Sequence, residues 1–466
     1  MTEKIKVALV NPPIIKGAFQ HHPYLPIGLT YLAAVLEKNS YEFKVIDCAA
    51  LGMDHKKLEG ELASFQPDVV GITSMTPTAH SALLSAQIAK NACPESLVIL
   101  GGPHAHFMDK KILFQEKAVD FIVRGEGEQT LLELLQCISS HCDPQKIMGI
   151  TFRKDENIVR TPDRPFIEEL DELPFPAYHY FPLKRYRLFG KMIFPIITSR
   201  GCPFQCSFCV TSRMFGKKFR SRKPENVAKE LEWLINNYGA GAVSFYDDTL
   251  TLDKNRIIKL FEEIKRRRID IPWDCQTRVD QVSEEILKGM KEANCQQVLF
   301  GVESGSQKIL SLMKKGTTVE QNEKAIKLAK EAGLFVAISV IIGYPGETSE
   351  TLEQTFNFIK KVKPDDVYVC IATPYPGTEL RSLIENMGWK ISNDWSLYDT
   401  VTPVFENPLL PTEEITRIRA KFYDDFYSPS YIITHMFKKN LYSRIMARTA
   451  ANHFIWRLRS IGMRLT

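Results

Sequence analysis

The chain has 466 residues, 44% of them hydrophobic and 25% charged, and a formal net charge of +5. That length exceeds what one hydrophobic core supports, so we expect two or three domains of an ordinary water-soluble protein, with no nucleic-acid partner. No run of eighteen apolar residues occurs, which argues against a membrane-spanning helix, and the N-terminus lacks a signal-peptide pattern. We therefore expect a cytoplasmic protein, in which the ten cysteines would not form a disulfide framework.

Residues 1–145 alternate predicted strands and predicted helices. We expect strands at 6–11, 43–47, 69–74, 98–101 and 120–123, and helices at 26–38, 56–65, 80–91 and 129–138. Strands rich in Val and Ile, joined by helical crossovers, are typical of a doubly wound parallel sheet, which is a Rossmann-like α/β fold. Ligands of such sheets bind beyond the carboxyl ends of the strands. Four loops at those ends are rich in small and polar residues: 11–13, 73–77, 101–104 and 124–128.

Residues 146–190 are predicted to be a connector. A short hairpin is expected over 149–153 and 157–161, and five prolines between 162 and 182 then keep the chain extended. A proline-rich bridge of this kind separates two folding units.

The second unit, residues 191–385, alternates again. We expect strands at 193–199, 242–246, 273–277, 297–301, 335–342 and 366–371, and helices at 225–236, 254–266, 283–293, 319–332 and 349–362. Six strand–helix units predict a partial (β/α)6 barrel of the TIM type. Chemistry in such barrels gathers on the loops that follow the strands.

Three cysteines, Cys202, Cys206 and Cys209, lie within eight residues directly after the first barrel strand. Closed metal sites use four protein ligands, so three thiolates leave one metal position open for another molecule. The structural alternative is a zinc knuckle that takes its fourth ligand from Cys275, Cys295 or a histidine.

The spacing Cys-x3-Cys-x2-Cys, with Phe208 before the last cysteine, resembles the signature of radical S-adenosylmethionine (SAM) enzymes. The four polar loops of the first unit, as an ordered set, resemble the cobalamin-binding domain found in one branch of that family. The strings from Gly301 to Ser306 and from Met313 to Gly316 also resemble this branch. The resemblance implies a [4Fe-4S] cluster on the three cysteines, together with SAM and cobalamin.

The same resemblance implies roles on the barrel loops. Asp247 and Asp248 would meet the SAM amino group, Glu303 its ribose, and the stretch Gly343–Pro345, with the backbone near Phe208, its adenine. The full set of expected SAM residues is Phe208, Asp247, Asp248, Arg278, Glu303, Ser304, Gly343 and Pro345. Simpler readings stay open, because one of the two aspartates could cap a helix and Glu303 could be a solvated loop charge.

In the first unit the resemblance implies cobalamin contacts on the polar loops. The expected residues are Asn11, Pro12, Thr73, Ser74, Thr76, Gly101, Gly102, Pro103 and Glu126. The histidine-ligating pattern Asp-x-His-x-x-Gly is absent, so we expect base-off cobalamin without a protein histidine on cobalt. The histidines on candidate rim loops are His21, His22, His104 and His106.

Residues 386–466 are aromatic and predicted to be helical over 412–426; by resemblance they would close the open side of the barrel. The last 37 residues carry seven Lys and Arg and no acid, interleaved with apolar residues. Two interpretations stay open: peripheral association with the inner face of an anionic membrane, or a packed helix pair with a basic outer face.

The resemblance implies a radical SAM enzyme that transfers a methyl group, through a 5′-deoxyadenosyl radical and methylcobalamin, to an unactivated carbon of a small molecule, including a lipid or a tetrapyrrole. An electron donor such as flavodoxin or ferredoxin would supply the electron. A cyclase or ring-rearranging enzyme with the same cofactors is the first alternative, and a non-catalytic cobalamin or redox sensor is the second. The sequence identifies no catalytic side chain and no substrate.

Overall fold

The computed structural model describes residues 5–14, 24–188, 190–438, 440 and 442–451. His21 and His22 lie outside this range, as do Lys439 and the arginines at 457, 459 and 464. No helix in the described ranges is long and apolar enough to cross a membrane.

The first sheet has seven strands in the order β2-β1-β3-β4-β5-β6-β7. The first five are parallel: β1 Lys6–Asn11, β2 Glu42–Asp47, β3 Val69–Thr73, β4 Leu97–Gly101 and β5 Phe121–Val123. In β1, β3, β4 and β5 the Val- or Ile-rich run is buried between helices, as a parallel sheet requires, whereas the edge strand β2 is mostly half-buried. The predicted doubly wound fold is confirmed.

The hairpin predicted in the connector is part of this sheet. β6 Ile150–Lys154 pairs antiparallel with β5, and β7 Asn157–Arg160 pairs antiparallel with β6. The hairpin covers the edge of β5, which would otherwise leave unpaired backbone groups. The proposed domain boundary near residue 145 therefore falls inside a continuous hydrogen-bonded sheet, and the division of the chain at that point stays a prediction.

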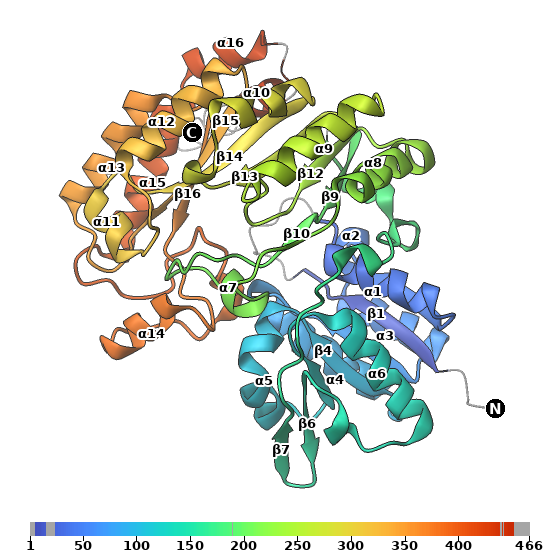
Figure 1. Cartoon of the computed structure of the whole chain (residues 1–466). Coiled ribbons are helices and arrows are strands. Elements are labelled where there is room, and N and C mark those ends of the chain that lie inside the picture. Colours follow the sequence, from blue (N-terminus) through green and yellow to red (C-terminus); the bar gives the residue numbers. More distant parts are fainter. Residues whose placement is uncertain (1–4, 15–23, 189, 439, 441, 452–466) are drawn as a thin grey trace, which may run out of the picture.

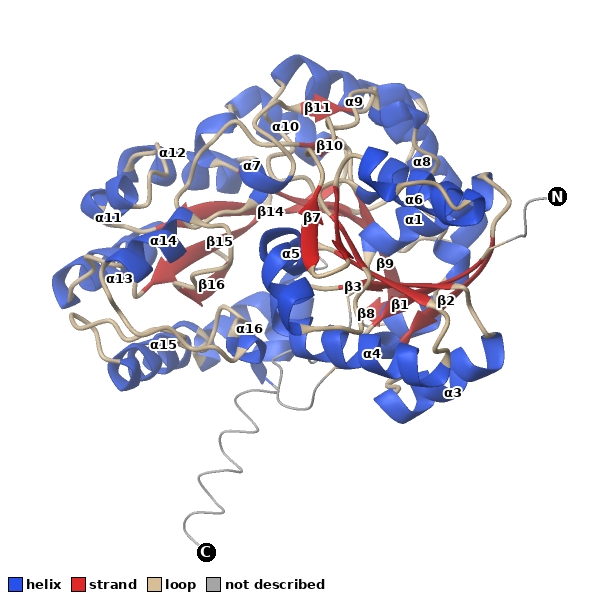
Figure 2. Cartoon of the chain, turned by 90° about the horizontal axis from the view of Figure 1, so that it is seen from below, coloured by secondary structure: helices blue, strands red, loops and turns tan. Residues whose placement is uncertain are grey.

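Helices cover both faces of the first sheet. α1 Ile27–Lys38 and α6 Gly127–Ser140 pack on one face, and α3 His55–Phe65, α4 Ala79–Ala92 and α5 Pro103–Gln115 pack on the other. Figure 2 shows α3 and α4 on one side of the strands and α1 and α6 on the opposite side. A four-residue helix, α2 Cys48–Leu51, follows β2. Helix α5 was not predicted, because Pro103 was read as part of a turn. Pro103 is the first residue of the helix, a position whose backbone N–H has no partner within the helix, so proline loses no hydrogen bond there.

The second sheet follows the order β16-β15-β14-β13-β12-β9-β8. Six strands are parallel: β9 Lys191–Ile196, β12 Ala242–Phe245, β13 Trp273–Thr277, β14 Cys295–Glu303, β15 Phe335–Ile342 and β16 Asp366–Ile371. The short β8 Arg187–Leu188 pairs antiparallel with β9. The outer helices are α8 Pro224–Tyr238, α9 Lys254–Arg266, α10 Glu284–Glu292, α12 Val319–Glu331 and α13 Ser349–Val362. The predicted partial barrel is confirmed.

Shorter elements surround the mouth of the barrel. They are β10 Ser199–Arg200 and β11 Arg220–Ser221, which pair with each other, and the helices α7 Thr211–Met214, α11 Gln307–Leu312 and α14 Glu379–Asn386. In Figure 1 α7 and β10 lie between the first sheet and the barrel. The cysteine loop runs between β10 and β11, so it is placed at the junction of the two units.

The C-terminal segment covers the open edge of the barrel with α15 Thr412–Phe426 and α16 Pro429–Met436. The backbone N–H of Val369 on β16 donates to the Tyr423 hydroxyl at 2.9 Å, and Arg419 Nε donates to the Val369 carbonyl at 2.8 Å. These side chains replace a neighbouring strand at the edge. The prediction that this segment closes the open side agrees with these contacts.

The helix over residues 442–451 packs against the barrel. Tyr442 contacts Phe335 and Ala337, and its hydroxyl donates to the Asp274 carboxylate inside the barrel. Lys438, one of the seven tail cations, forms an ion pair with Asp365 at 2.8 Å. The described part of the tail is therefore a packed helical segment, whereas Ile433 and Phe437 on its outer side stay exposed.

Two of the ten cysteines, which were not expected to form a disulfide framework, are joined in a disulfide. Cys137 and Cys142 are bonded at the end of α6, with 4.9 Å between their Cα atoms. His141 between them takes a left-handed conformation that turns the chain back on the helix. The bond is local and does not connect the two units.

Candidate active site

The cysteine loop is held in place by backbone contacts that its sequence permits. Gly201 has φ +88°, and a Cβ there would lie 2.2 Å from the Lys218 carbonyl oxygen, so only glycine fits between β10 and β11. Ser207 donates its backbone N–H to the Met313 carbonyl oxygen at 3.0 Å, and its hydroxyl pairs with that of Tyr344 at 2.7 Å. The two ends of the loop thus lie against each other, and Ser207 fixes the part between the cysteines to the mouth of the barrel.

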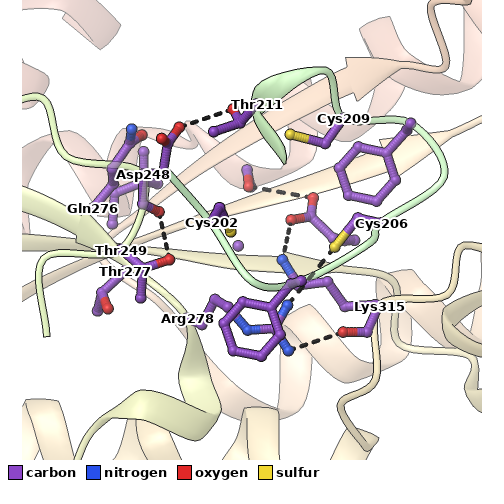
Figure 3. A pocket seen from close by; sticks show the side chains of 16 residues that line it. Cys202, Cys206, Cys209, Thr211, Asp248, Thr249, Gln276, Thr277, Arg278 and Lys315 are labelled. Carbon is purple, nitrogen blue, oxygen red and sulfur yellow. Dashed lines mark hydrogen bonds and ion pairs between the residues drawn. The ribbon is translucent and has the colours of Figure 1, made fainter. Parts of the chain in front are cut away.

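All three predicted cysteines line one cavity of about 170 Å³ at the mouth of the barrel (Figure 3). The remaining lining residues are Phe204, Phe208, Thr211, Asp248, Thr249, Gln276, Thr277, Arg278, Leu299, Gly301, Glu303, Lys315 and Ser339. They come from the cysteine loop and from four strands or the loops after them. The rule that barrel chemistry lies beyond the strand C-termini holds here.

The three sulfurs surround the cavity instead of converging on one point. Within the described part of the chain, no three His, Cys, Asp or Glu side chains are placed to hold a single metal ion. Cys275 and Cys295, the proposed extra zinc ligands, are buried behind the strands, outside the cavity. A cuboidal iron–sulfur cluster takes each thiolate on a different iron, so separated sulfurs around an open space fit a cluster better than a zinc knuckle.

Four of the predicted SAM residues meet in this cavity: Phe208, Asp248, Arg278 and Glu303. Asp248 accepts a hydrogen bond from Thr211 at 2.9 Å, and burial raises the pKa of its carboxyl group to about 6. Glu303, which has a left-handed backbone with φ +63°, pairs with Lys315 at 2.8 Å. Of the two carboxylates in the cavity, Glu303 is therefore paired with Lys315, whereas Asp248 accepts only a hydrogen bond from a neutral hydroxyl.

Asp247 and Ser304 do not line the cavity, and their predicted contacts with SAM stay predictions. Asp247 is fully buried, and its carboxylate accepts from the backbone N–H of Thr198 at 2.9 Å and the hydroxyl of Ser199 at 2.6 Å. Ser304 is bonded to Thr355 at 3.0 Å. Both hold the framework behind the site.

Gly343 and Pro345 are buried beside the cavity and do not line it. The backbone N–H of Gly343 donates to the carboxyl group of Glu347, and the Gly343 carbonyl accepts from Asn407 at 3.2 Å. Burial raises the pKa of Glu347 to about 8, and one of its oxygens has no partner. The loop after β15 is therefore shaped by its own acid and by the C-terminal segment.

The prediction missed several polar lining residues: Thr249, Gln276, Thr277, Lys315 and Ser339. Strand alternation would have found two of them. In β13 Trp273 and Cys275 are buried under the helices while Gln276 is exposed, and in β15 Ser339 is likewise turned inward between buried neighbours. The position of Lys315 depends on the fold of the loop after α11, which strand alternation does not describe.

At the carboxyl edge of the first sheet the structure shows a cradle between β3 and β4. The Ser74 hydroxyl is buried and has no hydrogen-bond partner. Gly102 has φ +94°, and a Cβ there would lie 2.8 Å from the Ser74 carbonyl oxygen. Thr73, Thr76, Gly101 and Pro103 adjoin these two residues along the same loops. An orphaned hydroxyl beside a side-chain-free backbone fits a ligand that approaches the main chain closely.

Asn11 and Glu126, two of the expected ligand contacts, are committed to protein partners. Asn11 donates to Asp47 at 2.8 Å, and Tyr186 donates to the same carboxylate; Pro12, next to Asn11, is buried. Glu126 binds Arg200 at 3.0 Å and Arg220 at 2.8 Å, with all three side chains buried. These residues tie the first unit to the connector and to the cysteine loop, and their contacts with cobalamin stay a prediction.

A buried ion cluster thus connects the two units directly below the cysteine loop. Arg200, two residues before Cys202, also binds Glu128 at 2.6 Å. Burial opposes the charged form of Arg200, yet Glu128 and Glu126 together hold its pKa above the ordinary value. The cluster fixes the base of the cysteine loop against the loop after β5.

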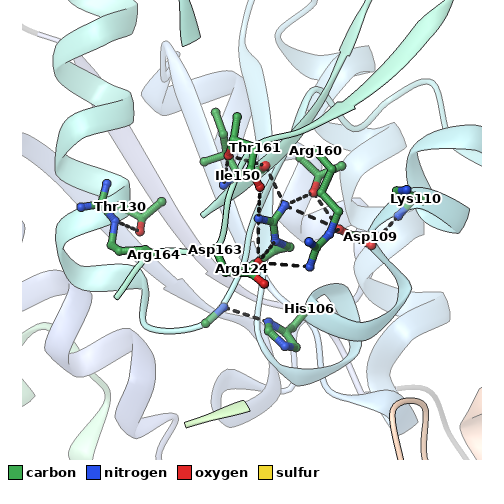
Figure 4. Close-up of polar contacts among 12 residues, drawn as sticks. His106, Asp109, Lys110, Arg124, Thr130, Ile150, Arg160, Thr161, Asp163 and Arg164 are labelled. Atoms are coloured by element: carbon green, nitrogen blue, oxygen red, sulfur yellow. Dashed lines mark hydrogen bonds and ion pairs between the residues drawn. The ribbon is translucent and has the colours of Figure 1, made fainter. Parts of the chain in front are cut away.

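Neither His104 nor His106 is free. Burial lowers the pKa of His104 to about 4, and its ring lies edge-on to Trp395 with 5.0 Å between ring centroids. His106 accepts from the Gly125 backbone N–H at 2.9 Å (Figure 4). In the same view Arg124 donates to the Ile150 carbonyl at 2.7 Å and pairs with Asp163 at 2.9 Å, which secures the hairpin to the sheet.

Comparison with known proteins agrees with this geometry. Residues 196–359 match the radical SAM superfamily, and residues 17–135 match the B12 binding domain. An uncharacterized methyltransferase of Pyrococcus horikoshii is 37% identical over 414 residues, covering 89% of this chain and 90% of the relative. The chain belongs to the cobalamin-binding radical SAM enzymes. It is accordingly an enzyme that uses a [4Fe-4S] cluster, SAM and cobalamin.

Other members of this family differ in their named reactions. The anaerobic magnesium-protoporphyrin IX monomethyl ester cyclase of Cereibacter sphaeroides is 32% identical over 443 residues, covering 91% of this chain and 70% of the relative. The cobalamin-dependent SAM radical enzyme OxsB, solved with aqua-cobalamin and SAM, shares the fold with a TM-score of 0.75 at 18% identity, covering 96% of this chain and 70% of OxsB. Family membership therefore leaves methyl transfer and cyclisation to be distinguished.

Proposed function

We propose that this radical SAM enzyme is a methyltransferase that acts on an unactivated carbon of a small molecule. The observation that carries the proposal is the cavity that unites the three cysteines with Asp248. Two relatives support it: the similar protein of Pyrococcus horikoshii is named a methyltransferase, as is a relative from Streptomyces wedmorensis that is 30% identical and acts on cytidylyl-2-hydroxyethylphosphonate.

In this proposal Cys202, Cys206 and Cys209 hold the cluster, and SAM occupies the remaining space of the cavity. The Asp248 carboxylate is mostly ionised at neutral pH, since its pKa is about 6, and suits the SAM ammonium group. Gln276 and Ser339 supply hydrogen-bonding groups on the inner wall. When bound, the cluster and SAM supply a radical and cobalamin supplies a methyl carrier.

The chain's own contribution is position and exclusion of water. Phe204 and Phe208 form apolar walls beside the cysteines, and the C-terminal segment covers the edge of β16. Deeper in the barrel, Tyr368 is in register with Ser339 and so shares its inward face; it keeps 44% of its surface exposed. We place the substrate against this inner surface. A dry enclosure protects a reactive intermediate from side reactions.

Cobalamin is proposed to lie over the cradle of Ser74 and Gly102, with its base off cobalt. This state suits the engagement of His104 and His106 with protein partners. The absence of nitrogen splitting from a protein ligand in the cob(II)alamin EPR spectrum would agree with it.

An electron donor of the flavodoxin or ferredoxin class is the proposed partner. Association of the tail with an anionic membrane stays a separate prediction, which sedimentation with vesicles would test.

Replacing Gly102 with alanine is expected to weaken cobalamin binding about tenfold or more, because the new Cβ forces Ser74 to shift and strains a left-handed backbone. The measurement is the amount of cobalamin retained after reconstitution and gel filtration. Gly239→Ala is the matched control: it has φ +57° and no atom within 4 Å of the added Cβ, and it lies at the end of α8, away from the cradle. Equal retention by the two variants would refute the assignment of the cradle.

The test of the function follows the methyl group of SAM. The reconstituted protein, with reductant and deuteromethyl SAM, is incubated with metabolite extract from a strain that lacks the gene. Mass spectrometry should find a small molecule that gains one labelled methyl group. A new product that carries no label, formed along with cleavage of SAM, would instead indicate the cyclase or rearrangement alternative.

A further inference from the structure

Arg278, at the end of β13, is buried against the cysteine loop. Its Nη1 lies 3.7 Å from Cys206 Sγ, within hydrogen-bonding range of a sulfur acceptor. The guanidinium carbon lies 3.6 Å from the ring centroid of Phe204, which covers one face of the group. Figure 3 shows the guanidinium directed at the Cys206 sulfur from below the loop. A fixed positive charge is therefore in direct contact with one of the three thiol groups.

The other donors of this guanidinium are occupied. Nε and Nη2 donate to the two oxygens of Asp280, each at 2.9 Å, and Nη2 also donates to the Lys315 carbonyl at 2.9 Å. Of the five N–H groups of an arginine, four have protein or sulfur partners here. The bidentate pair fixes the orientation of the fork. Too few donors remain for Arg278 to bind the carboxylate of SAM through two hydrogen bonds. The sequence placed Arg278 among the SAM residues without a specific role, and a contact with SAM stays a prediction.

Resting on the proposed function, we infer that Arg278 is a positioning residue that raises the reduction potential of the cluster held by Cys206. Reduction adds one electron to the cluster, and a nearby positive charge stabilises the more negative state. Hydrogen bonds to the sulfurs and low solvent exposure are established determinants of cluster potential. Phe204 adds to the effect because it keeps water from screening the guanidinium.

The electron balance is simple. One electron passes from a reduced flavodoxin- or ferredoxin-type donor, or from dithionite in the test tube, to the oxidised cluster, and no bond is made or broken in the protein. Arg278 shifts this equilibrium towards the reduced cluster. It would allow a donor of moderate potential to load the site.

The test is a potentiometric titration of the reconstituted protein, monitored by the EPR signal of the reduced cluster. In Arg278→Gln the equilibrium constant for reduction should fall about tenfold or more, a shift of about 59 mV to lower potential for one electron. Arg278→Lys keeps the charge without the fork and should shift less. The matched control is Arg213→Gln, which removes an exposed arginine four residues after Cys209 that does not line the cavity, and should leave the potential unchanged.

Iron content and SAM affinity are measured on the same samples. An Arg278→Gln variant with full iron content and an unshifted potential overturns the inference. If that variant also binds SAM more weakly, Arg278 contacts SAM and does not set the potential of the cluster. If Arg278→Gln does not retain iron, the comparison is made with Arg278→Met, which also removes the charge and for which an unchanged potential is equally contradictory. A wild-type protein that assembles no cluster would contradict the proposed function itself.

Discussion

Replacing Cys206 with alanine is expected to abolish cluster assembly, taking the iron content from about four atoms per chain to background. Three thiolates ligate three of the four irons and leave one open, and all three cysteines line the same cavity. With only two thiolates left, two of the four irons have no protein ligand, and the cluster is not held stably. Iron analysis and absorbance after anaerobic reconstitution measure the loss.

Cys295→Ala is the control for this experiment, since it removes a buried thiol outside the cavity. It should keep its iron and its absorbance spectrum. The same control also tests the zinc-knuckle alternative, in which Cys295 was a candidate fourth ligand. Full iron retention by Cys206→Ala, or loss of metal in Cys295→Ala, would contradict the assigned ligand set.

The second large effect concerns the ion cluster between the two units. Glu126→Ala should lower the free energy of unfolding by about 3–5 kcal/mol, because it leaves two buried arginines without their shared carboxylate. Urea unfolding of the purified protein measures the change. Since the cluster supports the base of the cysteine loop, the variant should also reconstitute with less iron.

An exposed pair on the same side of the site provides the comparison. Glu168 pairs with Lys218 at 2.5 Å, with 57% and 71% of the two side chains exposed. Glu168→Ala should cost less than about 1 kcal/mol, as surface ion pairs do. A Glu126→Ala variant that loses no more stability than Glu168→Ala would show that the buried cluster is not a structural connection.

The strands of both sheets could be predicted because a strand that is buried on both faces has a short run rich in Val and Ile. Residues 273–277 and 335–342, expected as strands, are strands with the same bounds. Helix α5 was missed because Gly102 and Pro103 occur both in turns and at helix starts. The Cys137–Cys142 bond was missed because it depends on a left-handed turn at His141, which sequence does not specify.

The site was predictable to the level of loops, and less so to the level of side chains. Cys202, Cys206 and Cys209 were found because their spacing alone is informative. Asp247 and Asp248 are adjacent in sequence, but only Asp248 faces the cavity, and the choice between them depends on a bend after β12. Glu126 was expected to face a ligand because it lies on a loop after a strand. Its ion pairs could not be foreseen, since Arg200 and Arg220 are more than seventy residues away in the chain. Long-range ion pairs of this kind have no local signal.

The central claim is that this chain moves the methyl group of SAM by way of a corrinoid bound to its own first domain. The most direct test needs no substrate: the holoprotein, reduced and supplied with deuteromethyl SAM, is separated from free nucleotides, and the protein-bound corrinoid is analysed by mass spectrometry. We predict a bound corrinoid that carries one labelled methyl group. A corrinoid that stays unlabelled while SAM is cleaved, or a protein that retains no corrinoid at all, would contradict the account.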